Sequence, residues 1–164
     1  MIVSRFRLFL VTAIILMTLT SVTTVFAAKP FVETFHNEGS FVAADCGTFL
    51  ALEDFVEDVR VKTFFDNAGI PIRVQVHVNF NGTITNSETG RTVRDPGHHT
   101  VTIDLEEGTQ TFAGMVFAIT VPGEGIAVLD AGKVVFDAEG NVIFVGGPHQ
   151  FLEEGPALIC AALD

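Results

Sequence analysis

The chain has 164 residues and a formal net charge of −11, because 20 acidic side chains outnumber 9 basic ones. Such a charge repels phosphate backbones and anionic lipid surfaces, so we expect no nucleic-acid partner and favour small neutral, apolar or cationic molecules. The sequence has 16 Phe but no Trp or Tyr. Sugar sites and protein-binding surfaces favour Trp and Tyr, so these two classes of function are also disfavoured.

Residues 1–27 predict a signal peptide. Arg5 and Arg7 precede an apolar run from Leu8 to Leu19, and Val25-Phe26-Ala27 matches a small-residue cleavage pattern. Several threonines interrupt the run, whereas an uncleaved anchor helix needs about 20 apolar residues in a row. We therefore expect cleavage after Ala27 and a secreted protein, periplasmic if the host has an outer membrane, without a membrane partner after cleavage.

The sequence has two cysteines, Cys46 and Cys160. Export to an oxidising compartment predicts a disulfide between them. Neither has the neighbouring His or second Cys that would support a reactive or metal-binding thiol. We expect a bridge that joins the first strand of the domain to its last segment.

In chain order, residues 28–40 predict a flexible N-terminal arm or an outlying strand, and short alternating runs follow between turn residues. Asn81-Gly82 is a strong hairpin signal. Residues 87–99 predict a loop that holds at most a short strand at 91–94, and the tail fits one helical turn. The runs themselves predict strands over residues 41–55, 58–66, 69–80, 83–86, 100–105, 109–121, 133–137 and 141–145.

Eight or so strands, without a helical pattern long enough for a βαβ unit, predict a single all-β domain over residues 41–164. We favour an antiparallel, up-and-down β-barrel, because short turns join the long strands and closure removes the edges that seed aggregation. A two-sheet β-sandwich is the alternative.

The run from Gly69 to Thr83 has two chemically opposite faces, because successive side chains of a strand point to opposite sides. One face is apolar and predicts part of the core or lumen. The other carries the polar ladder Arg73-Gln75-His77-Asn79. The ladder is either a line of hydrogen-bonding groups inside a barrel or the solvent-facing side of a half-buried strand. We favour the solvent, because a buried Arg73 would need a carboxylate partner.

Residues 113–145 are apolar on both faces, which is unusual for a soluble monomer. The chain's own tail is one candidate to cover the second side, through Phe151, Leu152, Leu158 and Ile159. A second copy of the chain is the other candidate. The residues expected in such a homo-oligomer interface are Val116, Ala118, Val135, Ile143 and Val145.

No pattern predicts a catalytic residue, a metal site or a cofactor. Adjacent residues diverge in an extended chain, so His98 and His99 would need His149 or Asp104 as further ligands of one metal. The acidic run of residues 53–58 lacks the spacing of a calcium loop and predicts a solvated charged turn. G-x-S-x-G and H-E-x-x-H motifs are absent.

The segments TNSETGRTV, LDAGKVVFDAEGNVIFVGGPHQ and CAALD are similar to segments of small exported bacterial proteins that are uncharacterised. This resemblance implies no activity. The strand pattern also resembles the architecture of lipocalin or allene-oxide-cyclase-like barrels, although the lipocalin entry motif with its tryptophan is missing.

We expect a secreted binding or interaction module whose apolar interior accepts a small apolar ligand. A cyclase or isomerase that uses His77 or His149 in a cavity is one alternative. A structural envelope protein without a pocket is the other. The residues expected to contact the ligand are Val74, Val76, Val78, Phe117 and His77.

Overall fold

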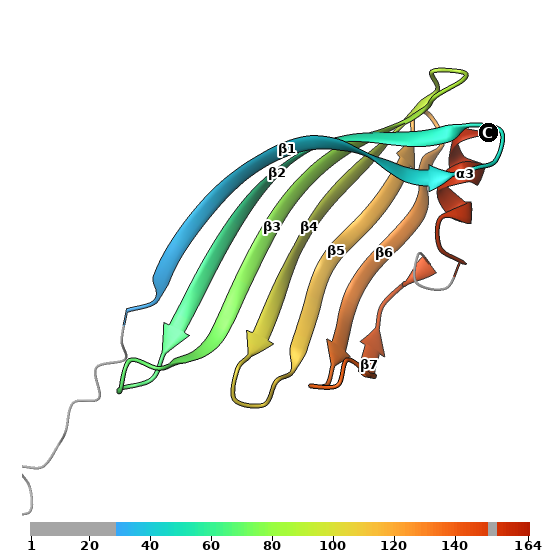
Figure 1. Cartoon of the computed structure of the whole chain (residues 1–164). Helices are drawn as coiled ribbons and strands as arrows, with labels where there is room; N and C mark the ends of the chain where they lie inside the picture. Colours follow the sequence, from blue (N-terminus) through green and yellow to red (C-terminus); the bar gives the residue numbers. More distant parts are fainter. Residues whose placement is uncertain (1–28, 151–153) are drawn as a thin grey trace, which may run out of the picture.

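A computed structural model describes residues 29–150 and 154–164 of the chain (Figure 1). The predicted signal peptide and residues Phe151 and Leu152 lie outside these ranges. The described part contains seven strands and a short C-terminal helix, α3 (Ala157–Leu163). The strands are β1 (Phe31–Asp45), β2 (Leu50–Phe65), β3 (Pro71–Asn86), β4 (Thr92–Asp104), β5 (Gln110–Val121), β6 (Gly125–Phe136) and β7 (Val142–Gly146).

The seven strands form one antiparallel sheet in the order β1 to β7. The all-β, up-and-down prediction is thus confirmed. The sheet is not closed, because β1 and β7 are not paired within the described residues. Figure 1 shows the long strands curving together, with α3 at one end of the sheet. The segment predicted as an arm or an outlying strand is a strand from Phe31 on, paired with β2 over its full length.

Two sequence expectations about β3 and β4 are wrong. Asn81-Gly82 is not a hairpin turn but lies inside β3, and the chain turns instead after Asn86. The predicted loop of residues 87–99 is mostly strand β4, in spite of Pro96. Pro96 has no N–H to donate, and it is tolerated because the pairing of β4 with β5 is interrupted between Arg94 and His98.

The core lies at one end of the sheet, beneath α3. Ile84, Val93 and Ile119 are at most 1% exposed there and pack with Ile159 and Leu163 of the helix. The predicted disulfide is present, and the Cα atoms of Cys46 and Cys160 lie 5.5 Å apart. The described part of the tail therefore covers apolar surface at this end of the sheet.

A β-bulge between Met115 and Phe117 changes the side-chain alternation of β5. Ala118, which the sequence predicts in an interface between copies, is buried, with an exposed fraction of 1%. The other four residues predicted there are not buried. Val116, Ile143 and Val145 are 40%, 58% and 52% exposed, and Val135 is half-buried.

Candidate functional site

The register of the strands gives the sheet two faces of opposite chemistry. The row Val61-Val76-Val101-Phe112 crosses β2 to β5 on one face, which we call the apolar face. The neighbouring row Arg60-His77-Thr100-Ala113 crosses the same strands on the other, which we call the polar face. All four residues of the first row are only half-buried.

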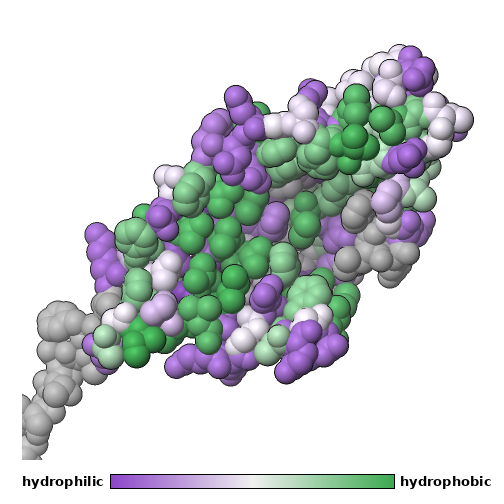
Figure 2. All heavy atoms as spheres, viewed as in Figure 1, coloured by the Kyte–Doolittle hydropathy of each residue, from purple (hydrophilic) through white to green (hydrophobic). Residues whose placement is uncertain are grey.

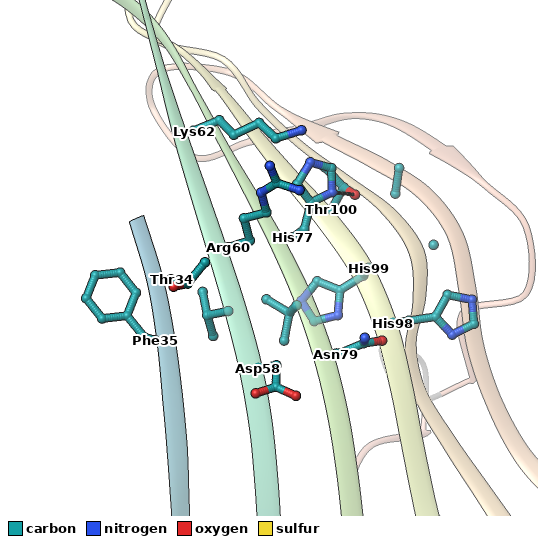
Figure 3. Close-up of a pocket in the computed structure, with 14 residues that line it drawn as sticks. Thr34, Phe35, Asp58, Arg60, Lys62, His77, Asn79, His98, His99 and Thr100 are labelled. Atoms are coloured by element: carbon teal, nitrogen blue, oxygen red, sulfur yellow. Dashed lines mark hydrogen bonds between the residues drawn. The ribbon is translucent and has the colours of Figure 1, made fainter. Parts of the chain in front are cut away.

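The polar face is hollowed into a depression of about 680 Å³ (Figure 3). His77 and Thr100 lie side by side in it, with 2.9 Å between Nδ1 and the hydroxyl oxygen. Nε2 of His77 is buried without a hydrogen-bond partner. Arg60 and Lys62 line the depression and form no ion pair within the described residues. A small hydrogen-bonding or anionic group fits here, but the net charge of the protein opposes anions.

Beyond the reach of α3, no other segment within residues 29–150 and 154–164 covers the apolar face. Figure 2 shows hydrophobic side chains gathered over the middle of the sheet, with hydrophilic ones around them. The half-buried residues of this surface come from four neighbouring strands. They are Val59 and Val61 of β2, Val74, Val76 and Val78 of β3, Val101 and Ile103 of β4, and Phe112 of β5.

Toward α3, the apolar face leads into a cavity of about 360 Å³, which we call the inner cavity. Val78 belongs to the apolar face and also lines the inner cavity, so the face and the cavity are continuous. Phe80, Phe117 and Ile159 form apolar walls. Phe41 also lines the cavity and is 48% exposed, which places it at the opening.

Of the three carboxyl groups that line the inner cavity, two are fully buried. Glu53 of β2 and Asp95 of β4 are only 2% and 3% exposed and hydrogen-bond to each other. The backbone N–H of Ala118 donates to Oδ1 of Asp95 at 2.9 Å, whereas Oε1 of Glu53 has no partner. Gly82 of β3 makes room for the pair, because a Cβ there would collide with Oε1 of Glu53.

Burial controls the charge of these groups. It raises the pKa of Glu53 to about 8, and the negative charge of Asp95 adds to this rise. Burial also raises the pKa of Asp95, against the hydrogen bond from Ala118, which favours the ionised form. Near pH 7 the raised pKa keeps a proton on Glu53, and the hydrogen bond from Ala118 favours the ionised form of Asp95. His99, also at the cavity, has a pKa lowered chiefly by burial and is neutral.

A second buried pair joins β6 to the segment that follows β7. Nδ1 of His149 is 2.8 Å from Oδ1 of Asp130, and Nε2 is 3.3 Å from the carbonyl oxygen of Gly146. Both side chains line an apolar cavity of about 210 Å³ together with Phe112, Phe136 and other residues. Because both ring nitrogens have partners, the imidazole ties the segment after β7 to β6.

The structure separates the residues predicted to contact a ligand. Val74, Val76 and Val78 lie on the apolar face, and Phe117 lines the inner cavity with Val78. His77 lies on the opposite face with the rest of the polar ladder. Contact of the four apolar residues with one ligand stays a prediction, and His77 does not face the same site.

Sequence reasoning missed Glu53 and Asp95. Glu53 was placed in a solvated turn, and Asp95 in a loop. A usable signal was present for Glu53, since it alternates in phase with Ala51, Phe55 and Val59 and so points to the apolar face of β2. For Asp95 the sequence offers no comparable signal, because Pro96 and Gly97 follow it.

Within residues 29–150 and 154–164, no group of three or more His, Cys, Asp or Glu side chains is placed to hold a metal ion. In the same part of the chain, no helix is long and apolar enough to cross a membrane. No protein-family model, curated protein or solved structure matches the chain.

Proposed function

We propose that this protein is a secreted binding module that holds a small, elongated apolar molecule along its apolar face, with one end in the inner cavity. The supporting observation is that half-buried aliphatic rows run without interruption from the open end of the sheet to that cavity. Uncovered apolar surfaces of this kind mark binding sites, and ligand sites are mostly apolar with a few polar groups. The disulfide is consistent with a function in an oxidising compartment.

An open sheet suits this function as well as a closed barrel, because the ligand itself covers the apolar side chains. Closure would require β1 and β7 to meet, and it stays a prediction. The area under the ligand supplies the free energy of binding, about 25 cal/mol for each Å² of apolar surface removed from water.

Binding of an uncharged, environment-sensitive apolar dye tests this function. The wild-type protein should bind the dye saturably. Val76→Lys places a charge in the middle of the apolar face and should weaken binding at least ten-fold. Thr102→Lys adds the same charge to the polar face and should leave dye affinity within about two-fold. Non-saturable dye uptake, or equal losses in the two variants, would refute the proposal.

Self-association is a second candidate function, favoured by the edge strand β7. Its residues Val142, Ile143, Phe144 and Val145 are each more than half exposed. An exposed apolar edge strand pairs readily with another chain. The mass of the protein in solution tests this candidate, and a monomer at high concentration would exclude it. Ile143→Lys should convert an oligomer into a monomer.

An isomerase-type enzyme is supported by the Asp130–His149 pair, which is the buried imidazole–carboxylate pair among the described residues and can form an acid–base unit. The carbonyl oxygen of Gly146, which pairs with Nε2 of His149, favours a structural role for the imidazole instead. His149→Gln separates the two: a structural residue lowers the Tm, whereas an acid–base residue lowers kcat at an unchanged Tm.

A further inference from the structure

The inner cavity contains a buried carboxyl pair and, among the described residues, no basic Lys or Arg beside it. Four titratable side chains line it: Glu53 and Glu57 from β2, and Asp95 and His99 from β4. The lining residues from β1, β3, β5 and α3 are all apolar, and no Lys or Arg lines the cavity in the described part of the chain. A buried charge is costly unless it is paired, so this arrangement lacks a component.

Glu53 leaves one polar atom of the pair without a partner. The residue lines the cavity and is 2% exposed, and its Oε1 is buried over Gly82 with no hydrogen-bond donor. One N–H donor reaches Asp95, from the backbone of Ala118. A carboxylate accepts several hydrogen bonds, so the pair has acceptor capacity left for a group that carries more than one N–H.

The remaining walls suit a positive charge. The rings of Phe41, Phe80 and Phe117 line the same cavity, and the faces of aromatic rings attract cations. His99 does not neutralise the pair, because burial lowers its pKa. The excess of acidic over basic side chains adds a long-range attraction for cations and a repulsion for anions.

We infer that the inner cavity binds the protonated amino group of an apolar amine, with Asp95 as its counter-ion, Glu53 as a further hydrogen-bonding partner, and the hydrocarbon part lying on the apolar face. This inference rests on the proposed function, since it names the class of molecule that the same face holds. The ammonium supplies the missing charge and N–H donors, while a fatty acid would place a second anion beside Asp95.

Three ligands with the same eight-carbon chain test the inference: octylamine, octanol and octanoate, measured by calorimetry at pH 7. Octylamine should bind at least ten-fold more tightly than octanol, and octanoate should bind most weakly. Asp95→Asn removes the counter-ion and should bring the affinity ratio of octylamine to octanol close to one. Asp54→Asn makes the same change of net charge at an exposed position of β2 and should keep the ratio.

The pH dependence of the ligand affinities gives a second readout. The octylamine-to-octanol ratio should fall when the pH drops through the raised pKa of Asp95, because protonation removes the charge. It should rise above pH 8 as Glu53 ionises, and Glu53→Gln should abolish that rise. Glu57 and His99 line the same cavity and also titrate, so the fall at low pH belongs to Asp95 only if Asp95→Asn, which retains both residues, does not show it.

The possible failures are distinguishable. If octanol binds and octylamine binds no more tightly, the inference is wrong and the proposed function stands. If Asp95→Asn keeps the preference for the amine, the counter-ion is misassigned and the inference is again wrong. If none of the three ligands binds, the proposed function fails, and the inference fails with it.

Discussion

The two ends of the apolar face carry the same kinds of side chain but differ in what covers them. Under α3, Val93 is 1% exposed, while Val101, on the same face of the same strand, is half-buried. The hydrophobic effect stabilises the folded state in proportion to the apolar area removed from water. The covered end therefore holds the fold together, and the open end retains apolar area that a ligand can still bury.

Removal of the disulfide is expected to have the largest effect on the stability of the covered end. The bridge closes a loop with a sequence separation of 114 and anchors α3 over the core. The double variant Cys46→Ala/Cys160→Ala should lose roughly 4 to 5 kcal/mol in the chain-entropy account. Urea unfolding measures this loss, and hydrogen exchange should show that amides near Ile84 lose protection first. An unchanged unfolding midpoint would mean that packing alone holds α3 in place.

Two Val→Ala variants should compare the two ends directly, through smaller losses in the free energy of unfolding. Val93→Ala removes fully buried methyl groups and should lower the free energy of unfolding by about 1.5 to 3 kcal/mol. Val101→Ala makes the same chemical change on the open end and should cost less than about 1 kcal/mol, because water already reaches this side chain. Equal losses in urea unfolding would show that something covers the open end in solution.

A saturating apolar ligand sharpens the same comparison. It should raise the unfolding midpoint of the wild-type protein, since a molecule that binds only the folded state stabilises it. The ligand should also increase the cost of Val101→Ala relative to Val93→Ala, because Val101 then lies under it.

The sequence predicts the fold better than it predicts the site. Alternation, hairpin signals and two distant cysteines are enough for an antiparallel all-β domain with a Cys46–Cys160 bridge. They do not determine closure, which depends on strand curvature and on whether two distant edges meet. Gly82 shows how local signals mislead: Asn81-Gly82 has the composition of a turn, yet the glycine is needed inside a strand, where the carboxyl of Glu53 leaves no room for a Cβ.

The candidate site was missed for a related reason. Polar residues in an acidic run are usually solvated. The register pairs Glu53 with Ile84 and Gly82 with Asp95, and the carboxyl of Glu53 reaches over Gly82 toward Asp95. The apolar half of the site was accessible from period-two alternation in β3. The polar half is a contact between Glu53 and Asp95, which are 42 residues apart in the sequence. No local pattern encodes such a contact.

The last prediction concerns pH and the covered end. The ordinary pKa of Glu53 is 4.5, and the folded value is about 8, so the folded protein holds a proton that the unfolded chain releases between these values. Its contribution to stability is fully present below pH 4.5 and is lost as the pH rises toward and through 8. The Tm should therefore decline from pH 5 to pH 9. Glu53→Gln cannot ionise, so its Tm should decline clearly less across the same range, while Glu139→Gln, at an exposed turn, should follow the wild type. Parallel curves for wild type and Glu53→Gln would mean that Glu53 titrates normally, and that the carboxyl pair is open to water like the far end of the same face.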